Sequence, residues 1–261
     1  MAGFRDQLNR VINLPSIPKR IISVVPSQTQ LLLYLGLDIE IVGITKFCIH
    51  PNAKVKAITK VGATKKLNIK LIKSLQPDLI IANKEENDRG QIEELMDVCP
   101  VWISDINDLE SALTMIQGIG DIAGKRQEAD ALNLEIRCRF DASIFPSLNI
   151  TVAYFIWKNP YMVAGRQTYI DSLLQKCGLT NVFESQRYPE VSPDELVAAN
   201  PGVVFLSSEP YPFKQKHIHE FKQLLPKAKV VLVDGEMFSW YGSRLLQVPE
   251  YLKELTTEII A

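Results

Sequence analysis

The sequence predicts an α/β protein with two Rossmann-like lobes, each with a mostly parallel sheet, joined by one long rigid backbone helix. Short β-branched apolar runs alternate with amphipathic helical patterns, which favours parallel strands connected through helices. The alternation stops at one long helical stretch and starts again after it, and 261 residues suffice for two lobes of ordinary size. We therefore expect an N-terminal lobe at 1–124, a connecting helix at 125–144 and a C-terminal lobe at 145–261.

The connecting helix is predicted from a stretch that contains neither Gly nor Pro. Ala129, Leu132, Ile136 and Phe140 recur at helical spacing on one face, while charged residues occupy the other. At 1.5 Å per residue such a helix is roughly 30 Å long, about the width of a small domain. The alternative is one more surface helix of a single domain.

The first lobe is predicted to contain four strands and four helices. The strands are short apolar runs, and Gly36 ends the first helix because glycine readily adopts the left-handed conformation there. Residues 45–64 are expected to be irregular. The expected strands are 20–25, 39–44, 79–82 and 101–103, and the expected helices are 27–35, 68–75, 89–96 and 109–122.

The second lobe repeats the alternation. Ser192, Pro193 and Glu195 form a capping box with proline at the first helical position, which strongly indicates a helix start. The expected strands are 150–156, 162–164, 203–206 and 230–233. The other expected helices are 169–176, which ends at Gly178, 218–225 and 243–260.

One pattern occurs in both lobes. Asn68 and Ser192 each stand nine residues before a proline, Pro77 or Pro201, and each proline leads into a buried apolar strand. Any helix–proline–strand unit gives this pattern, but the helical stretch between the two copies favours a duplicated lobe.

Composition excludes several classes of protein. The chain is 46% hydrophobic and 23% charged with a net charge of −1, which is typical of a globular protein and gives no field that would attract nucleic acid. No apolar run reaches the roughly 20 residues that a membrane helix needs. We expect four free, mostly buried cysteines, because no two of them stand close together in the sequence. We also expect a monomer. Residues 1–15 contain no apolar segment of a secretory signal, so a cytoplasmic location is one alternative.

Ligands of open parallel sheets bind beyond the carboxyl ends of the strands. The segments that follow the predicted strands are therefore the candidate binding loops. These segments are 27–28, 46–51, 83–87, 157–159, 207–211 and 237–241.

The residues resemble a known family, the substrate-binding proteins of ABC importers for cobalamin and ferric siderophores, and the cobalamin-binding members are the most similar by pattern. The resemblance covers nearly the whole chain from about residue 5, and it depends on the order and spacing of several motifs. These motifs are RIISVVPSQT at 20–29, LGL at 35–37, IVG at 41–43, the two proline-to-strand units, YMVAG at 161–165, CGLTNVF at 177–183 and FSWYGSR at 238–244.

The resemblance implies two α/β lobes joined by a rigid helix with little hinge motion, and a metal chelate or corrinoid bound in the cleft between them. The bound molecule is a ligand, and we expect no resident cofactor or metal. The resemblance also implies a non-enzymatic protein in the periplasm or cell envelope.

The candidate ligand-binding residues combine that resemblance with the strand-end loops. Aromatic faces suit a corrin, haem-like or catecholate ligand because stacking supplies contact area without a fixed hydrogen-bond pattern. Trp102 lies within a predicted strand and is expected in the core. The candidates are Phe47, Cys48, His50, Lys65, Asn83, Lys84, Trp157, Tyr188, Tyr211, Met237, Phe238 and Trp240.

Lysines are concentrated in the first lobe. Between residues 46 and 84 there are nine lysines (46, 54, 56, 60, 65, 66, 70, 73 and 84) and one carboxylate, Asp78. A solvated basic face is the default interpretation. Lys46, Lys65 and Lys84 fall in or near the candidate loops, where they would attract an anionic ligand.

Cys48 and His50 also suggest a transition-metal site, because thiolate and imidazole are good ligands for such metals. Two ligands do not make a site, and His217 and His219 fall on different faces of a predicted helix. Direct metal binding and axial ligation of a corrinoid by His50 therefore remain alternatives.

The family resemblance places an acidic residue on each lobe at the surface that docks onto an ABC permease. The second-lobe position is Asp194, beside Glu195, but the first-lobe position is Lys70, whose charge is reversed. This reversal speaks against an unchanged permease contact. A cytosolic metal- or chelate-handling protein, or an enzyme on the same fold, is the alternative function, although no phosphate loop, nucleophile elbow or HExxH motif is present.

Overall fold

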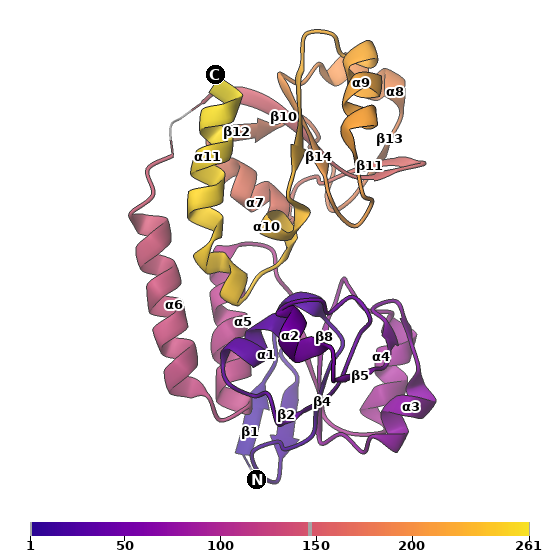
Figure 1. Ribbon diagram of the computed structural model, residues 1–261, viewed down its shortest axis with the longest axis vertical. Coiled ribbons are helices and arrows are strands. Elements are labelled where there is room, and N and C mark those ends of the chain that lie inside the picture. The colour runs from indigo at the N-terminus through magenta and orange to yellow at the C-terminus, as the bar shows by residue number, and fades with distance from the viewer. Residues whose placement is uncertain (1, 146–147, 261) are drawn as a thin grey trace. The chain divides into compact units, whose positions relative to one another are not determined.

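The computed structural model describes residues 2–145 and 148–260 and divides into two compact units (Figure 1). The first unit comprises Met1–Ile106, Glu110–Arg137 and Tyr241–Arg244, and the second comprises Asn107–Leu109, Cys138–Trp240 and Leu245–Ala261. Four residues lie outside the described part of the chain. Residues 1 and 261 are the outer ends of the predicted lobes, and residues 146 and 147 belong to the predicted second lobe. The boundaries predicted at 124 and 145 remain a prediction.

The first unit is built on a five-stranded sheet in which every pair of strands is parallel. The strand order is β5 (Thr59–Lys60), β4 (Ile41–Ile44), β3 (Ile21–Ser23), β8 (Leu79–Asn83) and β9 (Val101–Ser104). The first strand of this sheet in chain order, β3, lies in the middle. The next two strands, β4 and β5, are added on one side of it, and the last two, β8 and β9, on the other.

Helices cover both faces of this sheet. Ile72 of α3 (Ile69–Ser74) and Leu95 of α4 (Arg89–Met96) pack with the even-numbered residues of β8 in one core cluster, and Figure 1 shows these two helices together. On the other face, Trp102 is buried against α5 (Leu109–Ile122), as expected for a core tryptophan. The remaining helices of this unit are α1 (Pro26–Tyr34) and the short α2 (Asn52–Val55).

Two small sheets in the first unit were not predicted. The hairpin of β1 (Ala2–Arg5) and β2 (Val11–Leu14) closes around Asp6, whose Oδ1 accepts hydrogen bonds from the N–H groups of Leu8 (3.0 Å) and Arg10 (2.9 Å). The second sheet pairs β6 (Gly62–Ala63) with β7 (Lys66–Leu67). Together with α2 and β5, β6 gives structure to the segment 45–64, which we expected to be irregular.

The second unit contains a six-stranded sheet whose parallel part is β12 (Leu179–Asn181), β10 (Ile150–Lys158), β14 (Val203–Ser207) and β15 (Lys229–Val233). The strands β11 (Tyr161–Val163) and β13 (Glu190–Val191) extend it antiparallel. The sheets are therefore mostly parallel, as predicted.

Alternate residues of β10 face two different cores. Phe155 packs with Leu196 of α8 (Pro193–Ala199) and Phe221 of α9 (Gln215–Leu224), whereas Tyr154 packs against Phe238 of α10 (Gly235–Ser239). Figure 1 shows α8 and α9 on one side of the strands and α7 and α11 on the other. The remaining elements are α7 (Tyr169–Lys176), α11 (Val248–Ile260) and one turn of 3-10 helix, Ser243–Leu246, where we expected a continuous helix 243–260.

The two units share one topology. In the second unit the parallel strands follow the order second, first, third, fourth along the sheet, and the first unit has the same order once its two-residue edge strand β5 is set aside. The helix that leads into the third strand is capped by Asn68 in one unit and by Ser192 in the other, through side-chain oxygens that accept backbone N–H groups at 3.0 and 3.2 Å. The repeated sequence pattern therefore marks equivalent elements.

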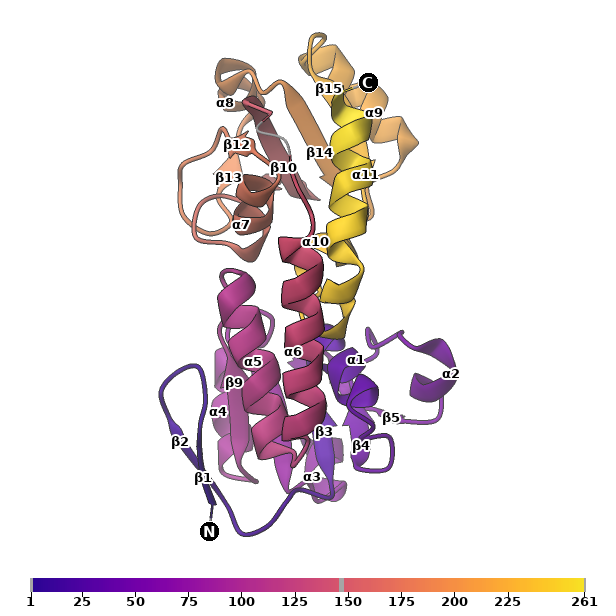
Figure 2. The ribbon, with the colours of Figure 1, turned by 90° about the vertical axis from the view of Figure 1, so that its left-hand side faces the viewer.

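The helix α6 (Arg126–Asp141) lies within the predicted connecting helix and links the two units. Ala129, Leu132 and Ile136 are buried, and α6 runs beside α5 in Figures 1 and 2. Asn133 Nδ2 donates to Leu113 O at 2.9 Å, which joins α6 to α5. Across the described residues, none of the helices combines the length and the hydrophobicity that a membrane crossing requires.

Candidate functional site

The carboxyl ends of β3 and β8 meet in the middle of the first unit's sheet, at the point where the direction of strand addition reverses. Such a point is where open α/β sheets bind ligands. Asn83, the last residue of β8, is buried, and its Oδ1 accepts the backbone N–H groups of Glu85 (2.8 Å) and Glu86 (3.0 Å). Its Nδ2 donates to Ser104 Oγ at 2.9 Å. We had predicted that Asn83 presents its amide to a ligand. In the structure its side chain is used within the protein, where it shapes the loop from inside.

Cys48 is also buried at this edge. Its Sγ lies 3.1 Å from Thr29 Oγ1 and 3.2 Å from Thr45 Oγ1. Burial raises the pKa of the thiol, although hydrogen bonds from the two threonines oppose the shift. A metal ligand must be the thiolate, so this environment disfavours metal binding through Cys48. Within 2–145 and 148–260, His, Cys, Asp and Glu side chains form no group of three that could hold a metal ion.

Exposed residues of the same edge include an aromatic side chain and lysines. Phe47 is 49% exposed, and Lys46 Nζ lies 5.0 Å from the centre of its ring. Lys84 forms an ion pair with Asp105 at 2.6 Å, and Lys65 Nζ donates to the carbonyl oxygen of Asn87 at 3.2 Å. His50, in the same loop as Phe47, is half-buried. Phe47, Lys46 and Ile49 are thus exposed side chains of this loop that are available to an incoming ligand.

In the second unit, an aromatic cluster lies at the carboxyl ends of β10 and β14, and Trp157, which we expected in the loop after the strand, is still part of β10. Trp157 is 39% exposed, and its ring centre lies 5.7 Å from that of half-buried Tyr211. Tyr211 in turn contacts Phe213 and the buried His217, whose Nδ1 accepts the backbone N–H of Lys214 at 2.8 Å. Burial lowers the pKa of His217. Because Nδ1 accepts a hydrogen bond, the neutral form of this imidazole carries its proton on Nε2, which lies 3.4 Å from the Tyr211 hydroxyl. His219 is exposed on another face of α9.

The predicted loop 237–240 is largely internal. Phe238 has no exposed surface and packs between Tyr154 and Tyr251, so our expectation of an aromatic face for a ligand is wrong for this side chain. Trp240 is buried, and its indole Nε1 donates to Glu209 Oε1 at 2.8 Å. Met237 is half-buried.

Glu209 organises this loop, and we did not select it from the sequence. Ser239 Oγ donates to its Oε1 at 2.6 Å, beside the bond from Trp240. Burial raises the pKa of the Glu209 carboxyl, and the nearby carboxylates of Glu236 and Asp234 raise it further, against the effect of the two donors. Two sequence signals marked it: its position after β14 in a candidate loop, and its place eight residues after Pro201, which repeats that of Glu85 after Pro77.

Three further predicted positions lie at other places of the second unit. Tyr188 is half-buried in the loop before β13. Asp194 and Glu195 are exposed in the first turn of α8, where Glu195 Oε2 accepts the backbone N–H of Ser192 at 2.7 Å. These hydrogen bonds with Ser192 lower the pKa of Glu195.

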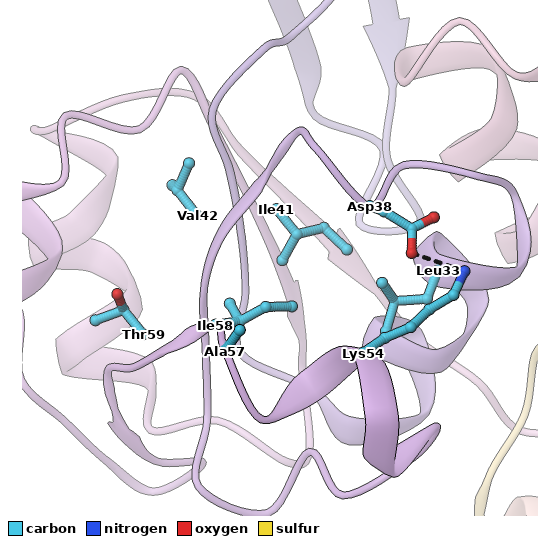
Figure 3. A pocket seen from close by; sticks show the side chains of 8 residues that line it. All are labelled: Leu33, Asp38, Ile41, Val42, Lys54, Ala57, Ile58 and Thr59. Carbon is cyan, nitrogen blue, oxygen red and sulfur yellow. Dashed lines mark ion pairs between the residues drawn. The ribbon is translucent and has the colours of Figure 1, made fainter.

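One hollow of the first unit does not lie at the carboxyl edge. It has a volume of about 400 Å³ and is lined by Ile41 and Thr59, the first residues of β4 and β5 (Figure 3). The ion pair between Lys54 and Asp38 (2.7 Å) closes one side of it. Because it lies at the amino ends of these strands, we do not treat it as the ligand site.

Comparison with known proteins agrees with this architecture. The sequence matches the family described as periplasmic binding protein over residues 21–225. It is 21% identical to a vitamin B12-binding protein of Pectobacterium carotovorum, covering 88% of this chain and 86% of that protein. It is 23% identical to an uncharacterized ABC transporter substrate-binding lipoprotein of Bacillus subtilis, covering 95% and 83%.

Among solved structures, the periplasmic heme-binding protein BhuT in complex with two hemes superposes with a TM-score of 0.80 at 23% identity, over 93% of this chain and 99% of that one. This likeness establishes the shared two-lobed α/β fold. The family match extends over most of the chain, from β3 to the end of α9. The chain therefore belongs to the family of periplasmic binding proteins.

Proposed function

We propose that the chain is a non-enzymatic binding protein for a metal chelate, which is a cobalamin-like corrinoid, a ferric siderophore or a haem-like ligand. Membership of the periplasmic binding protein family supports a binding role. The similar proteins that are named for vitamin B12 and for heme support a large, flat, metal-containing ligand.

The observation that carries this proposal is the pair of exposed aromatic side chains at the carboxyl edges of the two sheets. Trp157 presents its ring at the end of β10 and is held from behind by Tyr211. Phe47 presents its ring after β4. Aromatic rings gain free energy against a flat ligand through buried area and stacking, which are the contacts that a corrin or porphyrin offers.

Equilibrium titration tests the proposal. The purified chain is titrated with cyanocobalamin, haem, a ferric catecholate and a ferric hydroxamate, and we expect saturable binding of at least one of them. The substitution Trp157→Ala should weaken that binding about tenfold, as expected for a lost stacking contact of about 1–2 kcal/mol. Tyr34→Ala is the matched control, because Tyr34 is exposed at the far end of α1. Binding of none of the four ligands would overturn the proposal.

We further infer that the chain works at the cell envelope and delivers its ligand to an ABC permease. The similarity to a substrate-binding lipoprotein of an ABC transporter supports this inference. Asp194 is exposed on α8 and is suited to contact a basic permease surface, whereas the exposed Lys70 on α3 is not. A photo-reactive amino acid at position 194 should cross-link to the permease in membranes of the native host.

The same probe at position 253, in place of the exposed Lys253 of α11, serves as the control. Equal cross-linking yields at the two positions would refute the docking assignment.

A further inference from the structure

The N-terminus of α1 presents hydrogen-bond donors at the carboxyl end of β3. Pro26 is the first helical residue and has no N–H, and the N-cap residue Val25 supplies no side-chain acceptor. The N–H groups of Ser27 and Gln28 precede the first intrahelical bond, which runs from Thr29 N to Val25 O at 2.9 Å. Donors at the start of a nine-residue helix, together with the helix dipole, favour an acceptor oxygen there.

A second observation indicates a ligand at this place. The hydroxyl of Ser27 lies in the same first turn, and its Oγ has no hydrogen-bond partner, although Ser27 is only 3% exposed. Buried polar side chains almost always have partners, since an unpaired one is destabilising. Gln28 Oε1 is also unpaired. It is itself an acceptor and repels an anionic oxygen, so we assign only Ser27 and the helix N–H groups.

Neighbouring side chains hold this turn in place. Gln28 Nε2 donates to Ser104 Oγ at the end of β9, and the same oxygen accepts Asn83 Nδ2 at 2.9 Å. Asn87 Nδ2 donates to Val24 O at 3.0 Å, directly before the helix. The start of α1 is therefore fixed to the end of β9 and to the loop after β8, which lowers the entropic cost of binding at this turn.

The segment Tyr241–Arg244 belongs to the same unit and lies against this turn. Gly242 has φ +109°, and a Cβ added to it would be 3.5 Å from Ser27 O. Two side-chain hydrogen bonds hold the segment, from Tyr241 to Glu86 (2.8 Å) and from Arg244 to Gln30 (3.2 Å).

We infer that Ser27 Oγ and the N–H groups of the first turn of α1 form a subsite for an anionic oxygen of the bound chelate, a carboxylate or a phosphate. This inference rests on the proposed function and names one contact of that ligand. The bound oxygen accepts the Ser27 hydroxyl hydrogen and the backbone N–H groups together.

The substitution Ser27→Ala tests this subsite. For every chelate that binds the wild-type chain and carries a carboxylate or a phosphate, we expect Ser27→Ala to weaken binding about tenfold. The melting temperature of the variant should equal that of the wild type or rise, because an unpaired buried hydroxyl is removed. Ser74→Ala is the matched control, because Ser74 Oγ donates to Leu71 O on the exposed side of α3.

Paired ligands distinguish the two sources of the oxygen. Haem is compared with its dimethyl ester, which lacks free carboxylates, and cyanocobalamin with dicyanocobinamide, which lacks the phosphate-linked nucleotide. Ser27→Ala should weaken binding of the anionic member of a pair and leave binding of the other member unchanged. Equal effects on both members, or no effect on any bound chelate, overturn the subsite alone. Failure of all chelates to bind the wild-type chain overturns the proposed function and the subsite with it.

Discussion

At the scale of single residues, the side chains that we selected from the sequence divide into exposed and internal ones. Phe47 follows β4 and Trp157 lies near the end of β10, and both are exposed, as a binding role requires. Trp240 has polar neighbours but is buried, because its indole is held by Glu209, which lies 31 residues earlier. No local pattern records such a long-range contact. The candidate loops were predictable from strand ends, whereas the direction of each side chain was not.

Glu209 gives a prediction about pH. Its folded-state pKa is raised, so the neutral carboxyl stabilises the fold relative to the charged one. This stabilisation is fully present below the unfolded pKa, near 4.5, and is lost as the pH rises through the folded pKa. Glu209→Gln keeps an acceptor for Ser239 and Trp240 without the charge. The free energy of unfolding of the wild type, relative to this variant, should therefore fall as the pH rises from 4 to 8 in urea titrations.

Glu195→Gln is the matched control for this experiment, and its sign is opposite. The pKa of Glu195 is lowered by its hydrogen bonds with Ser192, so its contribution is present above the unfolded pKa and is lost as the pH falls through the folded pKa. The wild type should become more stable relative to Glu195→Gln as the pH rises through the folded pKa of Glu195 toward 4.5, and the difference should then stay level up to pH 8. A flat difference for Glu209→Gln between pH 4 and 8 would contradict the assigned environment.

At the scale of elements, local signals predicted the helices well. The bounds of α4, α5 and α7 are those expected from the sequence, and α8 begins directly after Ser192, the N-cap residue of its capping box. The elements that were missed are short. The β1–β2 hairpin depends on a turn organised by the buried Asp6, and α10 has five residues, fewer than periodicity can detect.

The two equivalent caps allow a prediction at this scale. Ser192→Ala removes the hydroxyl that accepts Glu195 N, and Asn68→Ala removes the amide oxygen that accepts Leu71 N. Each substitution should lower the free energy of unfolding by about 0.5–2 kcal/mol, as measured by urea denaturation. Ser74→Ala near the end of α3 is the control, with an expected change within about 0.5 kcal/mol. If Ser192→Ala and Asn68→Ala change the free energy of unfolding no more than this control does, tertiary packing alone determines where these helices start.

At the scale of the whole molecule, the sequence predicted two lobes of equal topology, and their duplicated strand order confirms it. The pattern could not show which lobe the long helix packs against, since periodicity reports a buried face but not its partner. In the structure, Arg126–Arg137 group with the first unit, where Arg137 forms a bidentate ion pair with Glu110 (2.6 and 2.7 Å). Phe140 instead groups with the second unit, and its ring lies 5.6 Å from Lys176 Nζ.

This grouping predicts how fragments of the chain behave. A fragment of residues 1–141 should be more stable than a fragment of residues 1–124, because only the longer one buries Leu132 and Ile136, at about 1.5–3 kcal/mol for each side chain. Thermal unfolding followed by circular dichroism measures the difference. Within the longer fragment, Leu132→Ala should be destabilising by about 2–5 kcal/mol, whereas Leu134→Ala should have little effect, since Leu134 is exposed on the same helix. If the fragment that ends at residue 124 proves equally stable, the helix contributes nothing to the first unit, and the boundary predicted from the sequence is the physical one.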